Sequence, residues 1–458
     1  MSDLNGTATT FDIATPLEHG EWRGYQKFVL ALVAMAIVLD GFDNQVLGFA
    51  IPALIKEWGV TRAAFAPVLA LGFLGMALGT AVGGWLGDKI GRRPSLIISV
   101  LLFGAATGMT AFADSVTHLG VCRVLAGFGL GGAMPCATAL VSEFSPLKRR
   151  SLAVTLGIVC IPLGGVVGGL IAAQVLPHIG WRALFATAGV LPLAVAIILF
   201  LFLPESIRFL VRRPAKRETL LKTLRRMGND VPDNALIEDS HEKTHKERAS
   251  LGSLFAPDFL RDTLALWIAF FFSLLATYIV YSWGPTLLVD SGFDIAISST
   301  ALAIFNTGGV LGAILGGVAV GAFGSRFSML VMAAGAVLGA VFLALTPLNN
   351  LAQNNVLISL FVLGAFMNAL QTTLYVLGAH IYPVQLRATG VGGAAGFGRL
   401  GAIAASFIGV AVLAGGGRTY FAAIAGTLAV SFVALVVIRR HSASVRSEAA
   451  AANPAIAE

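Results

Sequence analysis

Charged residues are scarce in this chain. Only 12% of its 458 residues are Asp, Glu, Lys or Arg, whereas 57% are hydrophobic. An ordinary soluble domain carries about 25% charged residues, which keep its surface in contact with water. This composition excludes a soluble globular protein and predicts a chain that lies largely within a lipid bilayer.

Cysteine and the common catalytic motifs are equally sparse. The three cysteines lie in apolar runs without the spacing of metal ligands. The 53 glycines fall within hydrophobic segments and do not form a phosphate-binding loop, and the sequence contains no nucleophile elbow. We therefore expect no disulfide framework, no metal site, no cofactor and no enzyme activity.

The chain does contain a series of apolar segments, each long enough to cross a bilayer. They predict an all-α membrane protein with twelve transmembrane helices, at residues 25–53, 63–86, 95–113, 119–144, 152–176, 183–203, 263–289, 298–323, 329–348, 356–382, 389–413 and 420–437. A polar stretch separates two sets of six. The expected parts are a tail at 1–24, a six-helix half at 25–203, a central loop at 204–262, a second six-helix half at 263–438 and a tail at 439–458.

The central loop is too polar to span a membrane, but it is long enough to hold a helix. Leu220, Leu221, Leu224 and Met227 have the spacing of one face of an amphipathic helix. We expect that face to pack against the rest of the protein.

The basic residues alternate between loops. Clusters such as Lys89, Arg92 and Arg93 fall on one side of the predicted helices, which is the cytoplasmic side by the positive-inside rule. The net charge of +7 therefore reflects membrane topology, and we expect no nucleic-acid partner. The first two dozen residues lack the basic start and apolar core of a signal peptide, so the N-terminus is expected to remain in the cytoplasm. An even number of crossings then places the C-terminus of this inner-membrane protein on the same side.

The two halves repeat one another. Residues 83–93 (GGWLGDKIGRR) align with 316–326 (GGVAVGAFGSR), so that the paired glycines, a later glycine and the last arginine coincide. Residues 143–150 (EFSPLKRR) align in the same way with 380–387 (HIYPVQLR). Two six-helix halves related by a parallel repeat are typical of transporters that bind substrate between the halves.

Several of these motifs resemble one known family along all twelve helices. Residues 84–93 are similar to the signature loop of the major facilitator superfamily, and residues 204–210 (PESIRFL) to a segment of its sugar, organic-ion and aromatic-acid porters. Residues 40–43 (DGFD), 387–392 (RATGVG) and 398–401 (GRLG) resemble its aromatic acid:proton symporters. The resemblance implies import of an aromatic carboxylate, such as benzoate or a hydroxybenzoate, together with protons.

The chain departs from the family pattern at two positions. Gly321 stands in the second copy of the signature loop where the first has Asp88, which predicts an asymmetric cytoplasmic gate. Ile161 precedes the Pro-Leu-Gly-Gly run of the fifth helix where the antiporter signature has glycine, which weakens an exchanger interpretation.

Two acids and an arginine are candidates for proton coupling. Asp40 and Asp43 share one face of the first helix, with Asp40 about 22 Å from its start. A carboxylate within the membrane raises the free energy of insertion, so it normally faces a cavity or a partner. The alternative for Asp43 is that it lies at the water-exposed outer end of the helix. Arg123 enters the fourth helix by about 9 Å, close to the depth of the acids, so it can either pair with them or reach outwards to water. The family resemblance implies the coupling role, and the sequence favours Asp43 as the proton carrier.

Arg399 is the candidate for binding a substrate carboxylate. It lies about 16 Å into the eleventh helix, near the middle of the membrane. Its guanidinium group offers a planar fork that stays charged when buried, but a structural ion pair is the alternative. Candidates for ring contacts are Tyr278, Tyr281, Asn368, Gln371 and Tyr375, although packing between helices is the commoner role of such residues. Phe270, Phe271 and Phe272 are expected to face lipid.

The remaining charges are candidates for a cytoplasmic gate. Asp88 can cap a helix or pair with neighbouring cations, whereas the cations by themselves can be explained by topology. The other predicted gating residues are Arg92, Arg93, Glu143, Arg150, His380 and Arg387. Two alternatives to an aromatic-acid symporter remain open: a porter for another small carboxylate or a sugar, and a membrane sensor of aromatic acids that does not transport.

Overall fold

The computed structural model describes residues 10–229, 231–232, 235–239, 251–346, 348 and 351–442. Residues 1–9 of the expected N-terminal tail, residues 443–458 of the C-terminal tail, and residues 230, 233–234 and 240–250 of the central loop lie outside this described part.

Twelve helices in the described residues are long and apolar enough to cross a membrane, which confirms the all-α, twelve-helix prediction. They are α2 (Gly24–Trp58), α3 (Phe65–Ile90), α4 (Arg92–Thr110), α5 (Val116–Glu143), α6 (Leu147–His178), α7 (Trp181–Phe202), α11 (Pro257–Asp290), α12 (Ile295–Phe323), α13 (Ser325–Leu345), α14 (Gln353–Ile381), α15 (Val384–Leu413) and α16 (Gly416–Val437). Most begin a few residues before the predicted apolar segment, because polar residues at helix ends continue the backbone hydrogen bonding. In α11, for example, Pro257 and Asp258 supply a favourable first turn six residues before Thr263.

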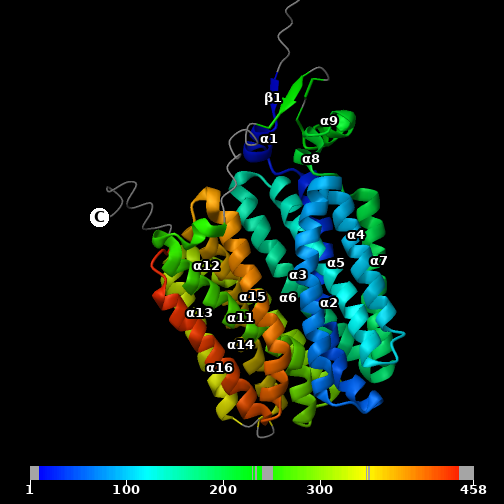
Figure 1. Ribbon diagram of the computed structural model, residues 1–458, viewed down its shortest axis with the longest axis vertical. Coiled ribbons are helices and arrows are strands. Elements are labelled where there is room, and N and C mark those ends of the chain that lie inside the picture. The colour runs from blue at the N-terminus through cyan, green and yellow to red at the C-terminus, as the bar shows by residue number, and fades with distance from the viewer. Residues whose placement is uncertain are drawn as a thin grey trace, which may run out of the picture.

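The helices form two bundles that lie side by side (Figure 1). Helices α2–α7 make one half and α11–α16 the other, and the halves meet where α6 packs on α12, α3 on α15 and α2 on α11. Small residues permit close packing within each half at equivalent places. A side chain at Gly127 would collide with the backbone of Gly72, and one at Gly364 with the backbone of Phe305.

The loops that repeat in the sequence also repeat in backbone conformation. Gly91, directly after α3, has a φ of 112°, and Gly324, directly after α12, has a φ of 81°. Both values lie in the left-handed region that favours glycine. The repeat therefore aligns two turns of the same kind, one in each half.

A small layer of structure covers one end of the first half, at the top of Figure 1. It contains β1 (Thr10–Asp12), α1 (Ala14–His19), α8 (Ile207–Val211), η2 (Pro214–Lys216), α9 (Arg217–Arg226) and β2 (Leu236–Glu238). Strands β1 and β2 pair in parallel, so the N-terminal tail and the central loop share a sheet. We call this end of the molecule the basic end, because the Lys89, Arg92 and Arg93 loop lies there; η1 (Arg62–Ala64) lies at the opposite end.

The amphipathic helix expected in the central loop is present as α9. Leu220, Leu221, Leu224 and Met227 are all buried, as their spacing predicted. A short helix, η3 (Leu251–Phe255), leads from the central loop into α11 and packs against α11 and α15.

Candidate functional site

Asp43 of α2 lies in a compact buried cluster with residues of α4 and α5. Its Oδ2 is 3.5 Å from Nη1 of Arg123, and its Oδ1 accepts a hydrogen bond from the Thr107 hydroxyl. Nη2 of Arg123 donates to Thr107 Oγ1 at 2.8 Å, and the guanidinium group lies 5.5 Å from the centre of the Phe185 ring. Both oxygens of Asp43 therefore have partners, and Arg123 turns inward to them instead of reaching to water.

Asp40 lies one turn before Asp43 and has a different environment. Its side chain is buried, and its Oδ1 has no hydrogen-bond partner among the described residues. Asp40 interacts electrostatically with Asp43 and with Arg399 of the other half. The two acids that share a helix face thus differ: Asp43 is fully paired and Asp40 is not.

Arg399 of α15 lies at the boundary between the halves. Its Nη1 donates to Oγ1 of Thr80 on α3, and the Thr80 hydroxyl in turn donates to the carbonyl of Met76 at 2.8 Å. Tyr278 and Tyr375 interact electrostatically with the same guanidinium group. Arg399 therefore touches one half of the protein while its helix belongs to the other.

The two tyrosines that interact with Arg399 pack against other aromatic rings. Tyr278 lies edge-on to Phe73 of the first half, with 4.7 Å between ring centres, and also interacts with Asn44. Tyr375 lies edge-on to Phe270 at 5.0 Å. Phe270 is completely buried, so the expectation that it faces lipid is wrong; its place in the helix turns it towards α14.

The predicted amide and tyrosine candidates lie in the same region of α11 and α14. The Tyr281 hydroxyl donates to Oδ1 of Asn368 at 3.2 Å, and Ser273 Oγ donates to Oε1 of Gln371 at 2.7 Å. The contact residues that were not identified from the sequence include Asn44, Phe73, Thr80, Thr107, Phe185 and Ser273. Amide, hydroxyl and phenyl groups all occur in membrane helices, and only their positions on the helix faces distinguish these residues.

A hollow lies beside the Asp43 cluster. It is lined by Asp43, Asn44, Phe73 and Arg123, together with apolar residues of α2, α3 and α5. The cluster therefore borders a space at the level of the aromatic residues. Among the residues that the structure describes, no group of three or more His, Cys, Asp or Glu side chains is placed to hold a metal ion.

Hydrogen bonds between the halves are distributed unevenly. Gln45 and Asn306 are both buried and exchange two hydrogen bonds, with Asn306 Nδ2 donating to Gln45 Oε1 at 2.8 Å. Nearer the opposite end, Arg62 pairs with Asp290 at 2.7 Å. Within the described ranges, every side-chain hydrogen bond between the halves lies at the level of Arg399 or further towards the opposite end. Polar contacts therefore bridge the two halves towards that end of the interface.

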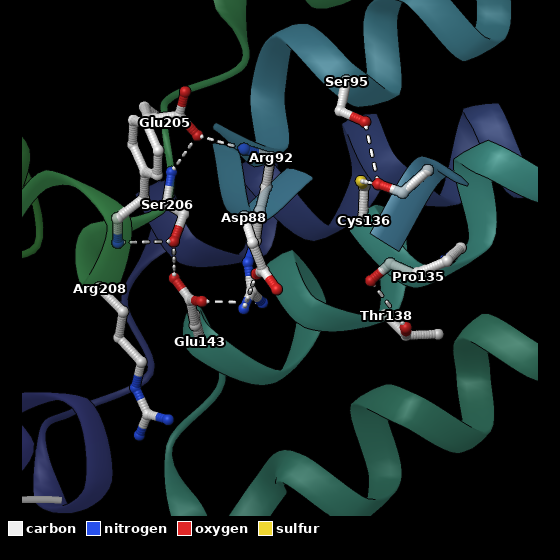
Figure 2. Close-up of polar contacts among 12 residues, drawn as sticks. Asp88, Arg92, Ser95, Pro135, Cys136, Thr138, Glu143, Glu205, Ser206 and Arg208 are labelled. Atoms are coloured by element: carbon white, nitrogen blue, oxygen red, sulfur yellow. Dashed lines mark hydrogen bonds and ion pairs between the residues drawn. The ribbon is translucent and has the colours of Figure 1, made fainter. Parts of the chain in front are cut away.

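A second polar cluster lies at the basic end of the first half (Figure 2). Nη1 of Arg92 is 3.0 Å from Glu143, whose side chain is only 4% exposed, and Nη2 of Arg92 is 4.0 Å from Asp88. The Ser206 hydroxyl donates to Glu143 at 2.6 Å. These contacts join the end of α3, the start of α4, the end of α5 and the segment after α7.

Glu205 caps α4 in this cluster. Its Oε1 accepts the backbone N–H groups of Arg92, Arg93 and Ser206 at 2.9, 3.0 and 2.8 Å. Burial raises the pKa of the Glu205 carboxyl, and the three N–H groups partly oppose that rise because they stabilise the charged form. Sequence similarity singled out the Pro-Glu-Ser segment, but the capping role of Glu205 is seen only in the structure.

The other predicted gating residues are more dispersed. Arg93 donates to the carbonyl of Phe200, and Arg150 donates to the carbonyl of Ser142 and lies 4.0 Å from Glu18 of α1. His380 and Arg387 are exposed on the second half. The structure thus brings Asp88, Arg92 and Glu143 together, whereas His380 and Arg387 lie apart from them.

The corresponding place in the second half is built differently. Ser325 at the start of α13 bonds to Ser442, and its hydroxyl is 3.1 Å from Nδ1 of His441. The Ser325 N–H group donates to the Ser442 carbonyl and not to a carboxylate, and Gly321 replaces Asp88. The two halves therefore share a turn but differ in the charges around it.

Comparison with known proteins agrees with this geometry. Residues 33–355 match the family model described as Major Facilitator Superfamily. The chain is 35% identical to a gallate transporter of Pseudomonas putida, over 88% of this chain and 90% of the relative, and 36% identical to the 4-hydroxybenzoate transporter PcaK of Pseudomonas aeruginosa, over 87% and 88%. Among solved structures, a partially occluded, inward-open form of the xylose transporter XylE from E. coli superimposes with a TM-score of 0.70 at 18% identity, covering 92% of this chain and 99% of XylE.

Proposed function

We propose that this chain, which belongs to the major facilitator superfamily, imports an aromatic carboxylate such as benzoate or a hydroxybenzoate together with protons. It is a multi-pass membrane protein and not an enzyme. The names of its relatives, which include gallate, 4-hydroxybenzoate and benzoate transporters, support the substrate class. We place it in the inner membrane with the basic end in the cytoplasm, on the distribution of Lys and Arg between its loops.

The observation that carries the proposal is the position of Arg399 between the halves. A guanidinium group that lies at this boundary, near a buried acid and aromatic rings, suits an anionic aromatic ligand. The substrate carboxylate would accept from the guanidinium fork, and Phe73, Tyr278 and Tyr375 would flank its ring. A sugar has no charge for Arg399 to bind, so this observation disfavours a sugar porter.

Asp40 is the better candidate for the proton carrier. The sequence pattern favoured Asp43, but both oxygens of Asp43 have partners, whereas Asp40 has an unpaired buried oxygen. Asp40 and a substrate carboxylate would compete for the same arginine. Protonation of Asp40 would remove its negative charge and leave Arg399 free to bind the substrate, which links proton uptake to substrate uptake.

In the proposed transport cycle, the two ends of the interface between the halves open in turn. The Gln45–Asn306 and Arg62–Asp290 contacts must break before substrate can enter from the opposite end. When the basic end closes in turn, His380 and Arg387 of the second half would approach the Asp88, Arg92 and Glu143 cluster of the first. We assign gating to these charges on that basis.

Uptake by reconstituted vesicles tests the proposal. Labelled 4-hydroxybenzoate should accumulate under an inward proton gradient, and a protonophore should abolish the accumulation. The Asp40→Asn variant should lose accumulation but retain exchange of preloaded substrate, because asparagine keeps the shape of the side chain without its titration. Binding without uptake by the wild type would instead indicate a sensor, and normal accumulation by Asp40→Asn would move the carrier elsewhere.

A further inference from the structure

The amide group of Gln371 is satisfied at one end only. Its Oε1 accepts the Ser273 hydroxyl at 2.7 Å, whereas its Nε2 is shielded from solvent and has no hydrogen-bond partner among the described residues. Turning the amide by 180° would exchange its two ends, and one of them would still lack a partner. A buried polar group without a partner is costly, so this position suits a ligand atom that completes it.

Other amides nearby do not share this property. Asn368 accepts from Tyr281 and donates to the carbonyl of Gly364 at 3.1 Å. Gln45 and Asn306 satisfy one another across the interface. Among the solvent-shielded amide groups in the described part of the chain, Gln371 is the one with a free end.

Helix geometry relates Gln371 to Tyr375, which interacts with the arginine of the proposed carboxylate site. It precedes Tyr375 by four residues on α14, which places the two on one helix face about 6 Å apart along the axis. Tyr375 interacts with Arg399 and packs on Phe270, which precedes Ser273 by three residues on α11. The Gln371 amide is therefore one helical turn from the Arg399 region, towards the opposite end.

An aromatic acid with a hydroxyl group across the ring from its carboxylate has a length comparable to that turn. With its carboxylate on Arg399, such a molecule would bring the hydroxyl to the free end of Gln371. We propose, building on the proposed function, that Gln371, positioned by Ser273, binds a ring hydroxyl group and makes the transporter selective for hydroxylated aromatic acids over benzoate. Benzoate would leave the amide unpaired, and sites built to hydrogen-bond a substrate hydroxyl discriminate against analogues that lack it.

The test compares 4-hydroxybenzoate with benzoate in vesicles that contain the full chain. The wild type should show a lower KM for 4-hydroxybenzoate. Gln371→Met keeps the length of the side chain but removes the amide, and it should raise the KM for 4-hydroxybenzoate about five- to tenfold while changing that for benzoate less than about twofold. Ser273→Ala should shift selectivity in the same direction by about two- to threefold, because the amide remains but is no longer held.

The control variant is Gln353→Met, which makes the same change at an exposed position of the same helix and should alter neither KM. Equal losses for the two acids in Gln371→Met, or no loss for either, would overturn the inference and leave the proposed function intact. Failure of the wild type to accumulate either acid would overturn the proposed function itself. If Gln371→Met does not reach the membrane, the selectivity of Ser273→Ala decides, since unchanged selectivity there contradicts the positioning role.

Discussion

The Asp43–Arg123 pair allows a sharp test of how the first half is held together. Its side chains are 1% and 6% exposed, so neither charge is screened by water. Replacing Arg123 with Leu would leave the Asp43 carboxylate buried with only Thr107 as a partner. Breaking a buried pair in this way costs about 3–5 kcal/mol, whereas replacing both members with apolar residues is often nearly neutral.

We therefore expect Arg123→Leu to lower the free energy of unfolding by about 3–5 kcal/mol, and Asp43→Leu combined with Arg123→Leu to recover most of that loss. Denaturant unfolding of purified protein in detergent measures both. The matched control is Arg62→Leu in the half-exposed Arg62–Asp290 pair, which should cost no more than about 1 kcal/mol. A double variant as unstable as the sum of its single variants would refute the reasoning, because it would show that the residues stabilise the bundle independently.

Three other outcomes depend on single contacts. Glu205→Gln should remain as stable as the wild type, because the oxygen that accepts three N–H groups is retained. Glu205→Ala should lower the free energy of unfolding by about 1–2 kcal/mol. Equal losses in the two variants would mean that the charge of Glu205 matters more than its acceptor oxygen. Arg62→Asp should slow uptake severalfold and a second change, Asp290→Arg, should restore it, unless the pair has no part in closing the interface. Arg399→Lys should remain folded and raise the KM for aromatic acids about tenfold or more, since lysine loses the two-pronged geometry; an unchanged KM would remove Arg399 from the site.

The transmembrane architecture could be predicted from the sequence because a bilayer imposes a length and a polarity on each segment. Both are properties of a stretch of chain and do not depend on its neighbours. Helix ends were less accurate because they depend on caps and on polar residues that extend the helix, as at the start of α11. The pairing of β1 with β2 was not foreseen, since it joins segments of only three residues each that are more than 220 residues apart.

For the candidate site, the depth of each residue in the membrane could be predicted, but the direction of its side chain could not. Depth along a helix follows from residue number, so the meeting of Asp43 with Arg123 could be anticipated. The rotation of each helix about its axis could not, because nearly uniform apolar helices give little sign of which face is buried. That is why Phe270 was assigned to lipid and why the contact of Thr80 with Arg399 went unseen.

The sheet formed by β1 and β2 determines where the chain can be divided into two separately expressed pieces. The central loop looks like a free tether between the bundles, and a cut just after Phe202 would seem natural. Such a cut would move α8, α9 and β2 to the second piece, although β2 pairs with β1 and α9 packs on the first bundle. A break between Asp239 and Leu251 keeps those partners on one polypeptide and leaves η3 with the bundle it contacts.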